Sequence, residues 1–206
     1  MEIKLLEKSE DSVKFYVKDI DYSFANLIRR SIMNEVPIMA IDEVTFHKNS
    51  SALYDEILAH RLGLLPLSTD LKSYNVKEEC KCKGKGCARC QLKLVLQAKG
   101  PCTVYAENIK SKDPKVKPVQ ANMPIVKLLK GQQLQFEAVA SLGYGKNHTK
   151  HTPGLVFYTY ADNDAKKENE FVFEIENWGQ LDTKEMILAG IDSFRAKLKE
   201  LNKLLK

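Results

Sequence analysis

The sequence lacks the features that would direct it to a membrane or a secretory pathway. No apolar run reaches the length of about 18 residues that crosses a bilayer. The first ten residues, MEIKLLEKSE, mix charged with apolar side chains and contain no apolar signal-peptide core. We therefore expect a protein of the cytoplasm that has no membrane contact.

Catalytic motifs are also missing. The sequence contains no P-loop, no G-x-S-x-G, no H-E-x-x-H and no paired-carboxylate motif. Its G-x-G, at residues 143–145, follows a predicted strand without opening a helix, so it is a weak nucleotide-binding signal. We predict a chain with no catalytic site of its own. The alternative is an enzyme whose site these motifs do not cover.

Positive charge is neither abundant nor concentrated. A net charge of +5 and a pI near 8.8 permit contact with nucleic acid or an acidic protein without requiring either. The modest concentrations, at residues 110–117 and at the C-terminus, are interpreted as solvated faces. Aromatic residues make up only 8% and do not interleave with a basic face, which argues against a single-strand-binding module.

What the sequence does contain is a cluster of cysteines. Four of the five fall between residues 80 and 90: Cys80, Cys82, Cys87 and Cys90. Without a secretion signal, such clustering favours metal over disulfides. Four thiolates complete a tetrahedral Zn²⁺ shell and leave no position for water, which is the structural arrangement. An iron–sulfur cluster and free thiols are the alternatives. Cys102 is predicted to be a buried apolar side chain rather than a fifth ligand.

The two chain ends share a pattern of predicted strands and helices, and the middle of the chain has a different pattern. Alternating apolar residues predict strands near 3–5 and 13–17, over 39–47, and at 171–175. Helices are predicted from Asp21, from about 55 to 62, and from a capping-box-like start at Asp182 to the C-terminus. Between about 70 and 165 the pattern is mostly β. The predicted fold class is therefore α+β.

The first and last predicted helices carry apolar stripes. On the first helix the stripe consists of Phe24, Leu27, Ile28 and Ile32. On the last helix the apolar residues recur at steps of four and three: Ile187, Ile191, Phe194, Leu198, Leu201 and Leu205. This spacing is typical of a helix that packs along another helix. An ordinary intrachain core is one interpretation, and a dimerisation surface is the other, because the last helix is long for a chain of this size.

Several segments together resemble the RNA polymerase assembly-subunit family, which comprises the archaeal D-type chain, the eukaryotic third-largest subunit and bacterial alpha. They are NLIRRSIMNEVPIMAIDEV, LYDEILAHRLGLLPL, LVLQAKGPCTVYAENI, FEAVASLGYGKNHTKHTPG and FEIENWGQL with the final helix. The resemblance spans nearly the whole chain. It implies an alpha-subunit-like dimerisation domain built from residues 1–39 and 168–206. A mostly β insert domain, 40–167, would carry the cysteine loop 80–90.

The resemblance also implies a function, that of a non-catalytic scaffold in transcription. Both helix stripes would face the small subunit L in a heterodimer. With subunits N and P, this heterodimer would form the platform for the large catalytic subunits of the nucleotidyltransferase holoenzyme. Arg29 and Arg30 match an arginine pair that contacts a large subunit. DNA would be met only indirectly, through the holoenzyme.

The cofactor implied by the resemblance is zinc. The cysteines match the zinc loop of the eukaryotic relatives in type and approximate spacing. Many archaeal members carry an additional ferredoxin-like domain with an iron–sulfur cluster, and 206 residues without a second cysteine set leave no room for one. The alternative function is a zinc-stabilised nucleic-acid-binding module.

Overall fold

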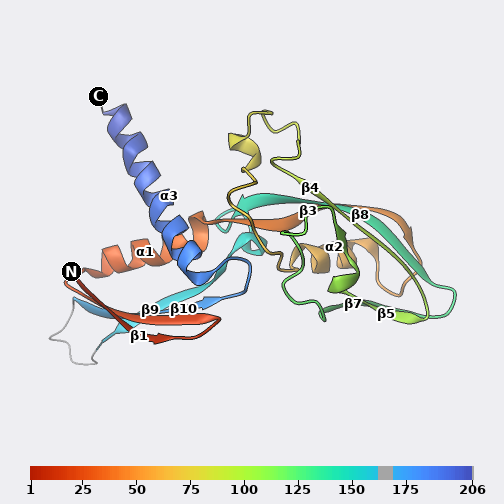
Figure 1. Ribbon diagram of the computed structural model, residues 1–206, viewed down its shortest axis with the longest axis horizontal. Coiled ribbons are helices and arrows are strands. Elements are labelled where there is room, and N and C mark those ends of the chain that lie inside the picture. Colours follow the sequence, from red (N-terminus) through yellow and green to blue (C-terminus); the bar gives the residue numbers. More distant parts are fainter. Residues whose placement is uncertain (162–168, 206) are drawn as a thin grey trace. The chain divides into compact units, whose positions relative to one another are not determined.

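The computed structural model describes residues 1–161 and 169–205, and it divides the chain into two compact units (Figure 1). Unit 1 combines Met1–Val36 with Tyr144–Lys206, and unit 2 is Pro37–Gly143. The described residues form α-helices and β-strands, which confirms the α+β class and the β-rich insert. The expected domain boundary between 167 and 168 lies outside the described residues.

Unit 1 contains a four-stranded antiparallel sheet of order β1-β2-β10-β9. Alternation places the apolar side chains of its strands on one face, where the rings of Phe15 and Phe173 stack with centroids 5.2 Å apart. The other face is charged, and Lys14 there pairs with Glu174 at 3.2 Å. The strands are β1 (Glu2–Lys8), β2 (Ser12–Lys18), β9 (Gly154–Tyr160) and β10 (Glu170–Asn177).

Strand β9 differs from the expected division of the chain, which placed it in the insert. It pairs with β10, with Val156 opposite Ile175 and Tyr158 opposite Phe173. These apolar side chains extend the same apolar face, and the Tyr158 ring lies 5.4 Å from that of Phe173. Unit 1 consequently resumes at Tyr144.

Two helices complete unit 1, α1 (Tyr22–Glu35) and α3 (Thr183–Leu204). Each begins at an aspartate that accepts a hydrogen bond from a backbone N–H of the first turn: Asp21 from Phe24 at 2.7 Å, and Asp182 from Lys184 at 3.0 Å. Helix α1 ends before Pro37, because a proline disfavours the helical conformation of the residue that precedes it, here Val36. No helix in the described part of the chain is long and apolar enough to span a membrane.

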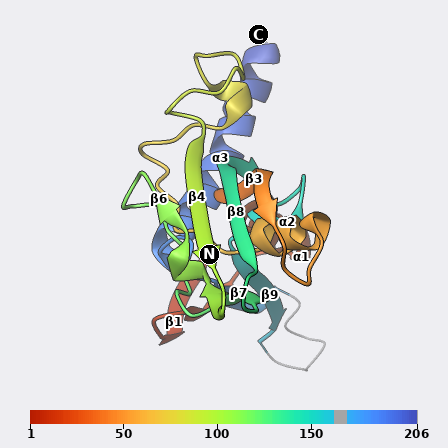
Figure 2. The same ribbon diagram turned by 90° about the vertical axis from the view of Figure 1, so that its right-hand side faces the viewer.

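Unit 2 is built on a second sheet, of order β3-β8-β4-β6 (Figure 2), and a two-stranded sheet β5-β7. Along β4, Leu92, Leu94 and Leu96 are buried and the residues between them are exposed. Helix α2 packs its buried Leu58 and Leu62 in the same unit. The elements are β3 (Pro37–Asn49), α2 (Asp55–Gly63), β4 (Leu92–Lys99), β5 (Cys102–Tyr105), β6 (Lys110–Ser111), β7 (Pro124–Leu128) and β8 (Gln133–Tyr144). Short 3₁₀ turns are η1 (Lys77–Glu79), η2 (Ala106–Asn108) and η3 (Thr149–His151).

Helices α1 and α3 meet at Gly190, which is buried against Ile32. A Cβ atom at Gly190 would lie 2.9 Å from Cγ1, 3.1 Å from Cα and 3.2 Å from the backbone nitrogen of Ile32. Two of these atoms belong to the backbone of α1 and cannot rotate away. The absence of a side chain at 190 therefore sets how closely the helices approach.

We expect Gly190→Val to lower the free energy of unfolding by about 1–3 kcal/mol, because the added side chain overpacks this contact. Valine has the better helix propensity of the two residues, so a loss would arise from packing. Urea unfolding followed by circular dichroism measures it. Ala196→Val, on the exposed part of α3, is the control and should change stability by less than about 0.5 kcal/mol. Equal effects of the two substitutions would contradict this account.

Candidate metal centre and partner groove

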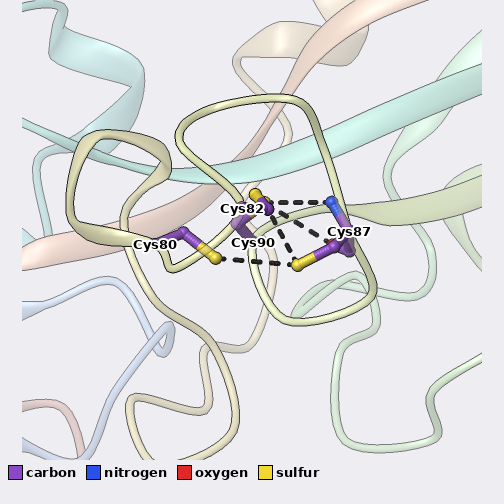
Figure 3. A group of neighbouring side chains, drawn as sticks. All are labelled: Cys80, Cys82, Cys87 and Cys90. Carbon is purple, nitrogen blue, oxygen red and sulfur yellow. Dashed lines mark hydrogen bonds between the residues drawn. The ribbon is translucent and has the colours of Figure 1, made fainter.

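The four cysteines converge in the loop between η1 and β4 (Figure 3). Their Sγ atoms all lie within 4.8 Å of one another, and Cys80–Cys87 and Cys82–Cys90 are each separated by 3.6 Å. A tetrahedral Zn²⁺ with Zn–S bonds of about 2.3 Å would place its sulfurs about 3.8 Å apart. A disulfide would need about 2.05 Å. The thiol arrangement therefore fits a small tetrahedral ion.

Two tight turns hold this cysteine loop in place. The backbone N–H of Lys83 donates to the Cys80 carbonyl at 2.9 Å, and that of Cys90 donates to the Cys87 carbonyl at 2.9 Å. The Cys87 N–H also donates to Cys90 Sγ at 3.2 Å. Gly84 and Gly86 both have positive φ, +77° and +83°, which glycine adopts without strain. Glycine at these two positions therefore lets the short loop turn back on itself.

The acid–base properties of the cysteines depend on their burial and mutual contacts. Burial raises the pKa of Cys90 to about 12. Burial also acts to raise the pKa of Cys82, but hydrogen bonds from Cys80 and Cys90 outweigh it and lower this pKa to about 6. Cys82 and Cys90 thus differ in acidity, and because a metal ion binds thiolates, its binding would be accompanied by proton release.

The base of the cysteine loop is tied to the sheet of unit 2. Lys77 Nζ lies 3.2 Å from Asp42 Oδ2 and 3.8 Å from Glu43 Oε1. The Ser141 hydroxyl on β8 donates to the same Asp42 oxygen at 3.4 Å. Cys102, in contrast, is exposed rather than buried, because it begins the short strand β5 and directs its thiol to the Lys99 carbonyl. The prediction of burial for Cys102 was wrong.

Unit 1 carries an apolar groove of about 670 Å³. The predicted stripes of α1 and α3 meet in it, together with the apolar face of β1 and β2. Its walls include Phe24, Leu27, Ile28, Ile187, Ile191, Phe194 and Leu198 from the helices, and Met1, Ile3, Leu5, Val13, Phe15 and Val17 from the strands. Among the residues of this groove, Ile3 is 59% and Leu5 is 63% exposed.

Of the remaining residues of the predicted stripes, one lies beneath the groove and two lie beyond it. Ile32 is only 1% exposed and forms the floor of the groove, because Gly190 packs on it. Leu201 and Leu205 are 53% and 78% exposed, and they lie beyond the groove on the last turns of α3. Every described residue of α3 from Arg195 onward is exposed.

The sequence did not indicate that strand β1 would be exposed on both faces. Its alternation of apolar and polar residues predicted a half-buried strand, yet all seven residues of β1 are exposed. The alternation identifies the apolar face correctly. It carries no information about whether the chain itself provides a cover for that face.

The two arginines of α1, Arg29 and Arg30, have different surroundings. Arg29 donates from Nε and Nη2 to Asn26 Oδ1, at 3.2 and 2.8 Å, and its Nη1 lies 3.7 Å from the Met33 sulfur. Arg30 is exposed and lines a polar hollow of about 380 Å³ between α1 and α3. Arg30 is therefore the more exposed member of the pair, and Arg29 is partly held within α1.

Glu35 closes the same polar hollow and joins three segments of unit 1. Its carboxylate lies 2.6 Å from Lys197 Nζ on α3 and 3.0 Å from Lys146 Nζ in the loop after β8. Burial acts to raise the pKa of Glu35, but hydrogen bonds from Lys197 and Lys146 lower it below its usual value. The ion pairs brace α3 against the end of α1.

The fold and the sites define an α+β chain in which a β-rich unit with a four-cysteine loop interrupts a unit built from both chain ends. Residues 39–156 match the RNA polymerase Rpb3/RpoA insert domain. The chain belongs to this family. The resemblance predicted from the sequence, to the archaeal D-type chain and its relatives, is thereby confirmed.

Curated relatives agree with this assignment. The chain is 48% identical over 160 residues to DNA-directed RNA polymerase subunit Rpo3 of Pyrococcus furiosus, and 46% over 156 residues to that of Methanosarcina acetivorans. These matches cover 78% and 75% of this chain but only 59% of each relative's length. The Archaeoglobus fulgidus subunit Rpo3 is 32% identical over 258 aligned positions, covering 100% of this chain and 98% of the relative. Because these positions outnumber the 206 residues, that relative has residues that this chain lacks.

We expect replacement of Cys82 and Cys87 by serine to abolish metal binding and to lower the Tm by about 5 °C or more, since a closed four-thiolate site contributes folding free energy. Elemental analysis by mass spectrometry and a thermal melt measure both effects. Cys102→Ser, outside the loop, should leave metal content and Tm unchanged. Full metal occupancy in the double variant would refute the ligand assignment. Detection of iron and sulfide in the wild type would show that the loop holds an iron–sulfur cluster instead of zinc.

Proposed function

We propose that this chain is a non-catalytic assembly subunit of an archaeal DNA-dependent RNA polymerase. Family membership and the printed names of its relatives support an RNA polymerase role. The observation that carries the assembly role is the uncovered apolar groove of unit 1. In the described part of the chain, the four cysteines are the one grouping of metal-binding side chains, and their closed arrangement suits structure rather than catalysis.

The groove needs a protein partner on energetic grounds. Full burial of an exposed leucine or isoleucine contributes about 1.5–3 kcal/mol, and partly exposed side chains contribute proportionally less. Ile3, Leu5 and Leu198 are each about half exposed, so covering them would contribute on the order of 1 kcal/mol apiece. A contiguous apolar surface of this kind marks an interaction site in a folded protein.

The partner we propose is the small subunit L, which would cover the groove to form a heterodimer. Helix α3 presents its stripe along a helical seam, and the exposed turns with Leu201 and Leu205 continue it past the groove. With subunits N and P, the heterodimer would form the platform for the large catalytic subunits. In this role, DNA would be met only indirectly, through that holoenzyme.

Zinc is the proposed cofactor of the cysteine loop, and an iron–sulfur cluster is the alternative. Within the loop, Cys80 and Cys90 are buried while the lysines and arginine between the cysteines are exposed. Such a loop has too little apolar surface to order itself, so the ion would supply folding free energy. Four thiolates on Zn²⁺ carry a formal charge of −2, which Lys81, Lys83, Lys85 and Arg89 would offset.

We expect Ile191→Asp combined with Leu198→Asp to prevent co-purification with subunit L, because each aspartate places an unpaired charge in the groove. Co-expression with a tagged subunit L, followed by native mass spectrometry, measures the pairing. Ala196→Asp combined with Asn202→Asp adds the same charge to exposed positions of the same helix and should leave a one-to-one heterodimer. Unaffected pairing of the groove variant would remove the groove from the interface.

We expect Arg30→Ala to weaken recruitment of the large subunits about tenfold or more while leaving the heterodimer intact. A charged hydrogen bond contributes about 1.5–3 kcal/mol, and 1.4 kcal/mol corresponds to tenfold. Arg29→Ala is the matched control, since its guanidinium is held by Asn26 and Met33 and should matter less. Binding of reconstituted heterodimers to the large subunits measures the difference. The double variant Arg29→Ala with Arg30→Ala is measured as well. If it recruits the large subunits normally, both arginines are ordinary surface charges.

A further inference from the structure

Unit 2 brings together lysines that are far apart in the sequence. Leu67 forms a β-bridge with Pro118, and the Ser68 N–H donates to the Lys117 carbonyl at 2.8 Å. The Ser68 hydroxyl donates to the Lys115 carbonyl at 2.7 Å. Segment 68–75 therefore lies along segment 111–117. Four lysines of these two segments, Lys72, Lys112, Lys115 and Lys117, are named the basic patch.

The carboxylates of the two segments are occupied by internal hydrogen bonds. Asp70 accepts from Lys115 Nζ at 2.9 Å, from the Ser73 hydroxyl at 2.8 Å and from the Lys72 N–H at 2.9 Å. The hydrogen bond from Lys115 contributes most to holding the pKa of Asp70 well below its usual range. Asp113 accepts from the Tyr74 hydroxyl at 2.8 Å. Both aspartates thus join the segments to each other.

The two segments hold four lysines and two aspartates, so their formal net charge is +2, and the lysines face solvent. Asp70 is paired with a lysine, whereas the hydroxyl from which Asp113 accepts carries no charge. Lys72, Lys112 and Lys117 are exposed, and none of them pairs with a carboxylate in the described part of the chain. Lys115, although paired with Asp70, keeps 67% of its side chain exposed. The sequence shows only the concentration at 110–117, because Lys72 joins it through the pairing of distant segments.

These two segments present little apolar surface: Leu71 is partly exposed, Pro114 is exposed, and no aromatic side chain of the segments is exposed. Leu67, Tyr74 and Val116 are buried, at 0%, 7% and 0% exposure. Protein interfaces depend on apolar or aromatic anchors at their centre. Single-stranded nucleic acid needs exposed aromatic rings for stacking. A duplex backbone needs neither, because it presents one phosphate charge per about 1.7 Å of axis to cationic side chains.

We propose that the basic patch binds the phosphate backbone of duplex nucleic acid, without sequence specificity. The proposal rests on unit 2 alone and does not depend on the subunit role. Each lysine that neutralises a phosphate releases a counterion, so binding should weaken steeply as salt rises. Lys72, Lys112 and Lys117 act through their free ammonium groups. Lys115 chiefly holds the two segments together through Asp70.

The test uses the full chain and a fluorescent DNA duplex of about 20 base pairs. Anisotropy titrations over a range of salt concentrations give the slope of log K against log [salt], which is about −0.9 per neutralised phosphate. We expect Lys112→Ala with Lys117→Ala to flatten this slope by about 1.8, and Lys72→Ala by about 0.9. Lys115 is left unchanged because its loss would release Asp70.

Lys130→Ala is the matched control, because it removes the same charge from the exposed turn between β7 and β8. It should leave the slope of the wild type. No measurable binding, an unchanged slope in the patch variants, or equal flattening by Lys130→Ala would each overturn the proposal. Tighter binding of poly-glutamate than of duplex would also overturn it, in favour of an acidic protein segment.

Discussion

At Gly190 helix α3 has no side chain, and its backbone therefore lies directly against Ile32 of α1. This contact fixes the two helices to each other, and the ion pair of Glu35 with Lys197 adds a second point of attachment. The apolar face of the four-stranded sheet is larger than two helices joined in this way can cover. Ile3 and Leu5 at the sheet edge remain exposed as a result, and the groove is what the close approach leaves open.

The cysteine loop shows a different balance between local and distant determinants. The spacing of the cysteines and the two glycines with positive φ are local, so the sequence sufficed to predict four converging thiols. The attachment of the loop through Lys77 to Asp42, and from there to Ser141, joins three distant segments. Nothing in the spacing of single residues signals such a polar network. It became visible only through the register of the sheet in unit 2.

The same distinction explains where prediction from the sequence stopped in unit 1. Helix starts at Asp21 and Asp182 were predictable, because capping is a contact between neighbours. The apolar stripes were predictable from periodicity as well. Which residue of a stripe is core and which is surface depends on what packs there, so Ile32 lies under Gly190 whereas Ile191 stays 38% exposed. Strand β9 likewise joins its sheet through pairing with β10, which its own residues do not specify.

The two surfaces proposed for interaction differ in the force that would drive binding. The groove is apolar, so its association would depend on surface removed from water and would change little with ionic strength. The basic patch has its apolar residues buried and its ammonium groups exposed, so its association would fall steeply as salt rises. Raising the salt concentration should therefore release nucleic acid from the basic patch while the protein partner stays bound in the groove. A single ionic-strength series on the assembled complex can consequently attribute each contact to its own unit of the chain.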